Sequence, residues 1–119
     1  MIAVVDDDES VRKALVRLLQ AAGHTARGFA SGNEFLQSWL SDKPDCLMLD
    51  LQMPGVSGTD VQRVLNRAGA SLPVVIITAH DAPGAREECM RAGAVAYLCK
   101  PLDERVLLEA LRIALGTSH

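Results

Sequence analysis

Short runs of apolar residues alternate along the chain with segments whose apolar positions have helical spacing. Five such runs cover residues 2–5, 25–29, 46–49, 74–77 and 95–98. Four of them are continuously apolar, as in parallel strands covered on both faces, whereas the run at 25–29 is weaker and typical of an edge strand. The pattern therefore predicts five β-strands, with the second at an edge of the sheet.

The first two predicted helices have the clearest boundaries. Apolar residues recur at i, i+3, i+4 and i+7 over 11–22, with Asp8 as the N-cap and Gly23 after the last turn. Ahead of the next helix, Ser31 is followed three residues later by Glu34, the spacing of a capping box. The strands at 2–5 and 25–29 are thus joined by a helix, and a second helix follows.

Three further helices complete the alternation. They are predicted at 61–68, at 83–91 with Asp81 or Ala82 near its N-cap, and from Asp103 to Gly116. Strict alternation of strands and helices implies right-handed crossovers, with helices on both faces of an open sheet. We therefore predict an α/β fold, a three-layer α/β/α sandwich around a five-stranded parallel sheet.

Length and composition narrow the functional classes. The 119 residues correspond to one domain over 1–119, with 116–119 interpreted as a truncated linker. The net charge of −3 and 3% aromatic content disfavour direct nucleic-acid binding. No apolar stretch approaches the roughly 20 residues of a membrane span, so we expect a cytoplasmic protein with no membrane contact. Three widely spaced cysteines are interpreted as small buried residues, at Cys46, Cys89 and Cys99.

Four of the predicted strands end on polar residues. The first runs into Asp6 and Asp7, the third into Asp50, the fourth into Thr78 and the fifth into Lys100. Any one of the acids or the threonine is also typical of a loop or N-cap position. Because parallel strands point the same way, however, all of these groups should gather at the sheet edge where such folds place ligand sites.

Three carboxylates in one pocket require a positive partner. Two unit charges about 4 Å apart repel by about 4 kcal/mol at an effective dielectric constant near 20. Lys100 supplies one positive charge, and a divalent ion would neutralise the two negative charges that remain. Since all candidate ligands are hard oxygen atoms, Mg²⁺ is favoured, with Mn²⁺ as a substitute. A salt bridge without metal stays open as the structural alternative.

This combination of groups suits the transfer of a phosphoryl group. A carboxylate that is already ionised needs no general base and can form an aspartyl phosphate as a nucleophile. A metal, an ammonium group and a hydroxyl would stabilise the oxygens of the transferred group. The sequence thus predicts that one of the acids is phosphorylated.

The chain resembles the receiver domain of bacterial two-component response regulators over essentially its whole length. The resemblance rests on VVDDDES, LDLQMPGVSG, Thr78-Ala79, and Tyr97 with Lys100-Pro101, in the expected order. It implies a flavodoxin-like (βα)5 fold with strand order 2-1-3-4-5. Within the family, the chain is most similar to receivers that precede a LuxR-type helix-turn-helix. DNA would then be contacted only through an output domain missing from these residues.

The resemblance also implies how the phosphorylation site is built. Asp50 would be the phosphoacceptor. Asp6, Asp7 and Asp50 would hold Mg²⁺ together with the backbone carbonyl of Gln52. Lys100 would pair with a phosphoryl oxygen. Asp8, outside the two-acid pattern, is assigned to the cap of the first helix rather than to the metal.

The resemblance also implies which residues respond to phosphorylation. Thr78 would move to hydrogen-bond a phosphoryl oxygen, and Tyr97 would follow by turning inward as the second part of the switch. The side chains of Gln52 and His80 would tune the rates of phosphorylation and hydrolysis. Pro101 resembles the family's cis-proline after the lysine.

The implied function is a phosphorylation-activated switch supplied by a sensor histidine kinase. The surface of the fourth helix, fifth strand and fifth helix would change to control an output, transcription, with a phosphorylation-dependent homodimer through the fourth helix and fifth strand. Such a chain would be no enzyme beyond assisting its own phosphorylation and dephosphorylation. Two alternatives stay open: a phosphatase resembling the haloacid-dehalogenase family, with Asp6 as nucleophile and Asp8 as acid and base, and a phosphate-independent interaction module.

Overall fold

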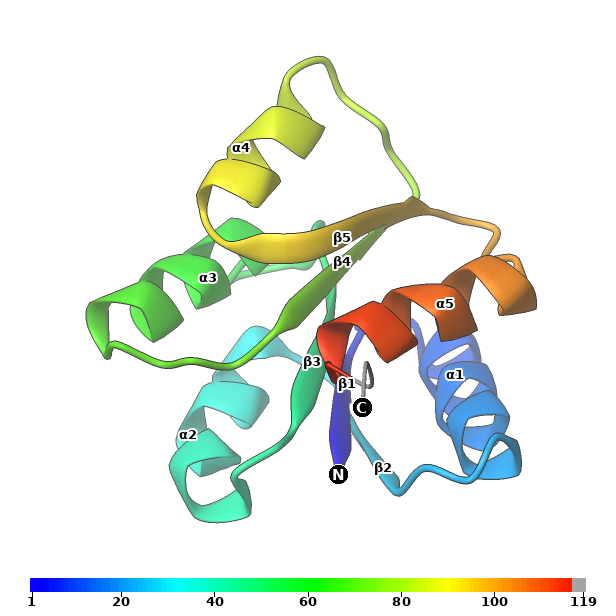
Figure 1. Ribbon diagram of the computed structural model, residues 1–119. Helices are drawn as coiled ribbons and strands as arrows, with labels where there is room; N and C mark the ends of the chain where they lie inside the picture. Colours follow the sequence, from blue (N-terminus) through cyan, green and yellow to red (C-terminus); the bar gives the residue numbers. More distant parts are fainter. Residues whose placement is uncertain (117–119) are drawn as a thin grey trace.

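Strands and helices alternate through residues 1–116, which the computed structural model describes (Figure 1). The strands are β1 (Ile2–Val5), β2 (Ala26–Phe29), β3 (Cys46–Asp50), β4 (Val74–Thr78) and β5 (Ala94–Cys99). The helices are α1 (Glu9–Ala21), α2 (Gly32–Asp42), α3 (Gly58–Arg67), α4 (Ala85–Arg91) and α5 (Glu104–Ala114). Of the predicted linker at 116–119, residues 117–119 lie outside the described part of the chain.

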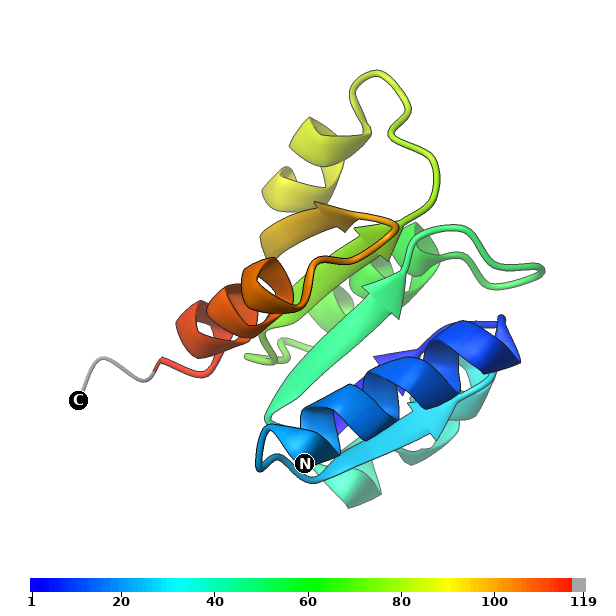
Figure 2. The same ribbon diagram turned by 90° about the vertical axis from the view of Figure 1, so that its right-hand side faces the viewer.

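The sheet is parallel, in the order β2-β1-β3-β4-β5. Helices α1 and α5 cover one face, and α2, α3 and α4 cover the other (Figure 1, Figure 2). The three-layer sandwich, the flavodoxin-like strand order and the edge position of the second strand are confirmed. Within residues 1–116, no helix combines the length and apolar character needed to cross a membrane.

The fifth strand is less buried than its apolar run predicts. It forms the second edge of the sheet, as the implied strand order requires, and its side chains are not buried throughout: Val95 is 38% exposed. An apolar run does not by itself distinguish an interior strand from an edge strand, since only the sheet order decides how much of each face is covered. Cys99 at the end of this strand is exposed, whereas Cys46 and Cys89 are buried. The interpretation of all three cysteines as buried is therefore wrong for Cys99.

The helix starts show which capping predictions hold. The Asp8 side chain accepts a hydrogen bond from the Val11 N–H (3.2 Å), which confirms it as the N-cap of α1. The Ser31 hydroxyl accepts from the Glu34 N–H (3.1 Å) in α2. Among residues 1–116, however, the Glu34 side chain does not return a bond, so only half of that capping box is present. A complete box lies at the start of α3, in the segment 57–60.

Helix α4 is shorter than predicted. It begins at Ala85 instead of residue 83, and its N-cap is Gly84 rather than Asp81 or Ala82. Gly84 has a φ of 80°, a left-handed conformation that separates the preceding turn from the helix. Within the described residues 1–116, no side chain caps this end of α4. The Asp81 side chain instead accepts a hydrogen bond from the Tyr97 hydroxyl.

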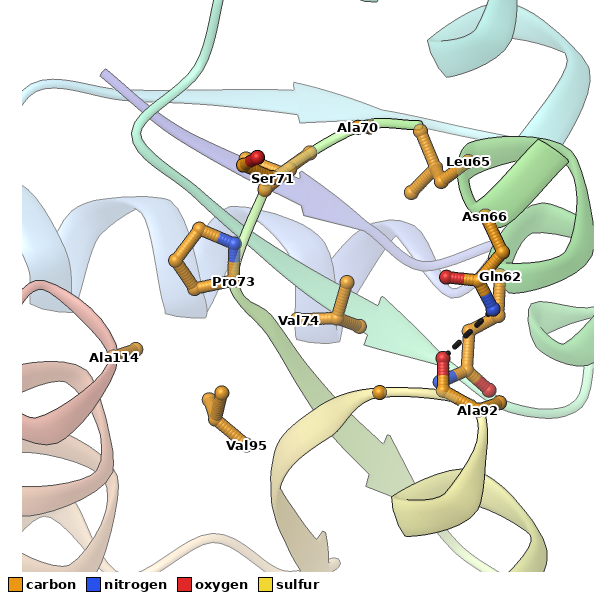
Figure 3. Close-up of a pocket in the computed structure, with 12 residues that line it drawn as sticks. Gln62, Leu65, Asn66, Ala70, Ser71, Pro73, Val74, Ala92, Val95 and Ala114 are labelled. Carbon is orange, nitrogen blue, oxygen red and sulfur yellow. Dashed lines mark hydrogen bonds between the residues drawn. The ribbon is translucent and has the colours of Figure 1, made fainter. Parts of the chain in front are cut away.

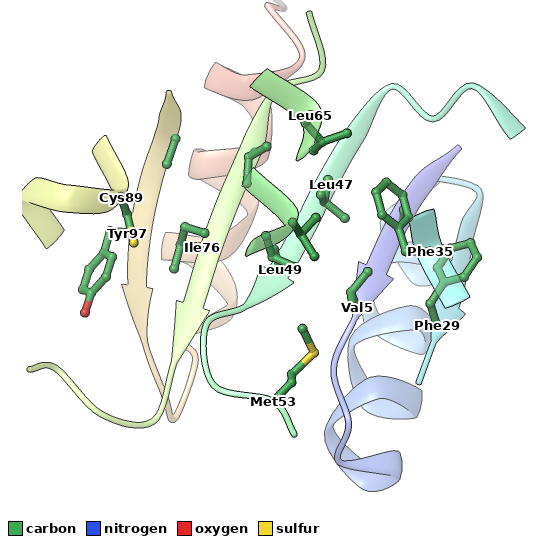
Figure 4. Close-up of a cluster of buried hydrophobic side chains, with 14 residues drawn as sticks. Val5, Phe29, Phe35, Leu47, Leu49, Met53, Leu65, Ile76, Cys89 and Tyr97 are labelled. Carbon is green, nitrogen blue, oxygen red and sulfur yellow. The ribbon is translucent and has the colours of Figure 1, made fainter. Parts of the chain in front are cut away.

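An aromatic contact in the core joins α2 to the edge strand β2. The rings of Phe29 and Phe35 meet edge to face, 5.5 Å between centroids and 81° between planes (Figure 4). Both side chains are fully buried, Phe35 with 0% exposure. Leu47 and Leu49 of β3 belong to the same cluster, which packs α2 and α3 against the sheet. This packing fixes β1 and β3, the strands that lead into the acidic residues.

Replacing Phe35 with alanine should lower the free energy of unfolding by about 3–5 kcal/mol, because it removes buried ring area and leaves a cavity. Leu40 lies on the same helix with 69% exposure, so the Leu40→Ala control should change stability by less than about 0.5 kcal/mol. Urea unfolding followed by circular dichroism measures both. Equal losses in the two variants would contradict the assigned packing of α2.

Candidate functional site

The acidic residues converge at the carboxyl edge of the sheet, as predicted. Asp6 and Asp7 follow β1 directly, and Asp50 is the last residue of the adjacent strand β3. One carboxylate oxygen from each of the three lies within 4.8 Å of the others. Asp6 and Asp50 are buried, at 0% and 4% exposure, whereas Asp7 is exposed. The site therefore has two interior acids and one acid facing solvent.

Lys100 enters this cluster from the end of β5. Its Nζ donates to Asp6 Oδ2 at 2.9 Å and lies 3.7 Å from Asp50 Oδ2. The peptide bond from Lys100 to Pro101 is cis, as the resemblance implies. The predicted gathering of acids and lysine is thus present, and the lysine is bound more closely by Asp6 than by Asp50.

The charges of the cluster are only partly balanced. Burial raises the pKa of Asp50 to about 7, and the charge of Asp6 adds to the effect, while Lys100 and the Gln52 N–H oppose it. For Lys100, burial favours the neutral form, but the hydrogen bond to Asp6 and the charge of Asp50 outweigh it and raise its pKa. A single ammonium group therefore does not balance the charge of the carboxylates, and the pKa of Asp50 stays raised. Three hard oxygen donors with surplus negative charge fit a divalent cation such as Mg²⁺.

The loop after Asp50 folds back tightly on the strand end. Asp50 Oδ1 accepts a hydrogen bond from the Gln52 N–H at 3.3 Å, and the Gly58 N–H donates to the Leu51 carbonyl at 3.0 Å. A β-carbon at Gly58 would lie 2.7 Å from the Asp50 carbonyl oxygen and 2.8 Å from the Leu51 Cα. Only glycine allows α3 to start this close to Asp50. The side chain of Gln52 itself is exposed.

Thr78 ends β4 beside the cluster, but its hydroxyl is engaged elsewhere. Thr78 Oγ1 donates to the His80 carbonyl at 2.9 Å and accepts from the His80 N–H at 3.1 Å. The side chain is fully buried, and His80 is exposed. Within residues 1–116, no hydrogen bond joins Thr78 to the acids. The structure therefore places Thr78 at the predicted edge with its hydroxyl bonded inside its own loop.

Tyr97 lies in the core, and its hydroxyl binds Asp81, a partner that the sequence does not predict. The ring is 6% exposed, and the hydroxyl donates to Asp81 Oδ1 at 3.1 Å. Burial and this carboxylate raise the pKa of Tyr97 to about 12, so the phenol stays protonated. The guanidinium of Arg86 lies 5.9 Å from the ring centre. The sequence marks Asp81 only as a candidate helix cap, although this residue lies three positions after Thr78 in the same loop.

A separate hollow lies away from this cluster. It has a volume of about 310 Å³ and is lined by the carboxyl-terminal part of α3, the start of β4 and the turn after α4 (Figure 3). Gln62 Nε2 donates to the Cys89 carbonyl at 3.1 Å, and Asn66 Nδ2 donates to the Ala92 carbonyl at 2.8 Å. Since the hollow is near the amino end of β4, whereas the acids follow strand ends, it is no part of the acidic site.

The raised pKa of Asp50 has a consequence for stability. Between about pH 4 and pH 7 the folded chain keeps a proton that the unfolded chain, with an ordinary pKa of 3.8, has released. The metal-free protein should therefore lose stability as the pH rises through this range. Asp50→Asn removes the ionisable group and should be more stable than the wild type above pH 7, by about 1–4 kcal/mol.

Urea unfolding of metal-free protein between pH 4 and pH 8 measures this difference, which should shrink toward pH 4. Glu87 is an exposed carboxylate on α4, and Glu87→Gln serves as the control with a flat difference. A pH-independent difference for Asp50→Asn would show that burial does not shift the pKa of this carboxyl group.

Comparison with known proteins agrees with the geometry. Nodulation protein W of Bradyrhizobium diazoefficiens is 38% identical over 111 residues, which are 93% of this chain and 49% of that protein. The transcriptional regulatory protein FixJ of Azorhizobium caulinodans is 34% identical over 117 residues, 98% of this chain and 56% of that protein. The chain thus spans about half the length of these curated relatives.

Solved structures and a family model extend the comparison. A crystal structure of a response regulator receiver protein from Burkholderia phymatum matches with a TM-score of 0.85 and 46% identity, over 97% of this chain and 94% of that one. The model of the response regulator receiver domain matches residues 2–112. Because that match covers nearly the whole chain and the fold agrees, this chain belongs to the family of response regulator receiver domains.

Proposed function

We propose that this chain is a phosphorylation-activated signalling switch in which Asp50 accepts a phosphoryl group from a sensor histidine kinase. The observation that carries the proposal is the placement of Asp50: its carboxylate lies at a strand end beside two other acids, with the Lys100 Nζ 3.7 Å away. Receiver domains of two-component systems are switched by phosphorylation, and this chain belongs to that family. The proposed function is supported by family membership together with the three carboxylates and the ammonium group that phosphoryl transfer to an aspartate would use.

The transfer itself requires one bond to form and one to break. An Asp50 carboxylate oxygen attacks the phosphorus of the donor, the new P–O bond forms, and the donor imidazole leaves with the electron pair of the P–N bond. Asp6, Asp7 and Asp50 would hold Mg²⁺ with the Gln52 carbonyl. When bound, the cation offsets negative charge on the phosphoryl oxygens. Lys100 favours the ionised form of Asp50 and would pair with a phosphoryl oxygen.

The response begins in the loop that follows β4. The Thr78 hydroxyl would exchange its bonds to the His80 backbone for a phosphoryl oxygen, which moves that loop toward Asp50. Asp81, in the same loop, holds the Tyr97 hydroxyl. Because Thr78 and Asp81 share this loop, a movement that starts at Thr78 would reach Tyr97 through the Asp81 hydrogen bond and change the surface of α4, β5 and α5. The side chains of Gln52 and His80, both of which are exposed, would tune the rates of transfer and hydrolysis.

The output of the switch is proposed to be transcription. FixJ, a relative that this chain matches over 56% of its length, is named as a transcriptional regulatory protein. We propose a DNA-binding output region of the LuxR type in the complete protein, which acts in the cytoplasm. Met90 of α4 and Val95 of β5 are each 38% exposed and provide apolar area for a phosphorylation-dependent homodimer.

The contacts of Asp6 and Asp8 disfavour the phosphatase alternative. Asp6 Oδ1 accepts from the Asp8 N–H at 2.9 Å, and Asp6 Oδ2 accepts from Lys100 at 2.9 Å, so both oxygens of this fully buried carboxylate are bound within the protein. The Asp8 carboxylate caps α1 instead of acting as an acid or base. The membership of the chain in the receiver family also removes the reason for that alternative.

The phosphorylated residue can be identified directly. After incubation with Mg²⁺ and a small acyl phosphate donor, borohydride trapping and mass spectrometry should place the label on Asp50. Asp50→Asn should reduce incorporation to background while its circular dichroism spectrum stays unchanged. Lys100→Ala should still be modified but should lose the spectroscopic change that accompanies modification.

Two results would contradict the proposal. Label on Asp6 would support the phosphatase alternative. No change in mass or spectrum of the wild type with any small donor or cognate kinase would support a phosphate-independent interaction module.

The acidic cluster should also stabilise the folded protein through Mg²⁺. At a Mg²⁺ concentration ten times the dissociation constant, the gain should be about 1.4 kcal/mol, seen as a higher melting temperature. Asp7→Asn should remove most of this gain. Asp8→Asn is the matched control, since asparagine keeps the helix cap and the gain should persist. A gain that Asp7→Asn leaves unchanged would place the cation elsewhere.

A further inference from the structure

The turn that carries Asp6 and Asp7 is held on both sides by hydrogen bonds. The Asp6 N–H donates to the Phe29 carbonyl at 3.2 Å, and the Asp8 N–H donates to Asp6 Oδ1 at 2.9 Å. The Arg12 side chain binds the turn on one side of Asp7, since its Nη1 donates to the Asp6 carbonyl at 2.9 Å. On the other side, the Asp8 carbonyl accepts the first helical hydrogen bond of α1, from the Arg12 backbone N–H at 2.9 Å. The guanidinium of Arg12 therefore joins the residue before Asp7 to helix α1.

The side chain of Arg12 reaches the turn because β2 leaves room for it. Helix α1 and strand β2 lie side by side at the front of Figure 2. A β-carbon at Gly28 of β2 would lie 2.9 Å from Cγ and 3.0 Å from Cδ of Arg12. Gly28 pairs with Val4, two residues before Asp6. A larger residue at position 28 would thus displace the aliphatic part of Arg12 next to the turn.

We propose that Arg12 is a positioning residue for the acidic cluster and sets its affinity for the divalent cation without touching the cation. The inference rests on the proposed function, since it requires the cluster to bind Mg²⁺. Asp7 is exposed, so the place of its carboxylate depends on the backbone on either side. A turn already ordered by Arg12 lowers the entropy that cation binding must otherwise remove.

The substitution Arg12→Met separates the hydrogen bond from the packing, because methionine keeps an unbranched apolar side chain and loses the donor. Isothermal titration calorimetry should give a Mg²⁺ dissociation constant about fivefold higher, as expected for the loss of one hydrogen bond. Hydrogen exchange of the Asp8 amide should become faster in the metal-free variant. Arg12→Lys, which keeps a charged donor, should restore part of the affinity.

Lys13→Met is the matched control for charge. Lys13 is the next residue of α1, is 64% exposed and pairs with Glu9, so its loss should leave the Mg²⁺ dissociation constant within about twofold. Gly28→Ala provides a second test, because it retains the guanidinium but pushes its aliphatic part aside. It should weaken Mg²⁺ binding in the same direction as Arg12→Met.

Each remaining outcome overturns a distinct statement. An unchanged Mg²⁺ dissociation constant in folded Arg12→Met and Gly28→Ala, with faster exchange at Asp8, would limit Arg12 to a structural role. Equal weakening by Lys13→Met would assign the effect to net charge. A wild-type protein that binds no Mg²⁺ would overturn the metal site of the proposed function, and this inference with it.

Discussion

Repulsion between Asp6 and Asp50 is the constraint on which the site depends. Both carboxylates are buried, at the ends of neighbouring strands whose register is fixed by the sheet. A buried acid beside another acid resists ionisation unless positive charge is close. Burial, and then the charge of Asp6, raise the pKa of Asp50 to about 7, while Lys100, which binds Asp6 more closely, opposes this rise only in part. The fold thus holds the Asp50 carboxylate in a partly protonated state, and additional positive charge nearby would favour its ionised form.

Much of the fold is encoded in local patterns. Alternating apolar runs and helical stripes gave the order of elements, and Asp8 gave the correct start of α1. The convergence of Asp6, Asp7, Asp50 and Lys100 was predictable because parallel strands end at one edge. Each of these inferences uses residue type and spacing, or the common direction of parallel strands, without knowledge of particular side-chain contacts.

Features that depend on contacts between distant residues were not predictable in this way. The start of α4 follows from the left-handed φ of Gly84, and the hydroxyl of Tyr97 binds Asp81, which lies in the loop after β4. The contact of Arg12 with the Asp6 carbonyl requires the space at Gly28, sixteen positions further along the chain. The residues at the strand ends do not predict this contact. The contact involves the backbone carbonyl of Asp6, and it depends on the absence of a side chain at Gly28.

The two ends of α4 are held very differently. At its carboxyl end, amide groups of Gln62 and Asn66 bind the carbonyls of Cys89 and Ala92, and so tie the last turn to α3. At its amino end, no side chain of residues 1–116 provides a cap, and the helix contacts the sheet through Arg86, whose Nη1 donates to the Tyr97 carbonyl at 3.5 Å. A displacement of the loop after β4 would therefore act first on the amino end of α4, while the amide contacts to α3 restrain its carboxyl end.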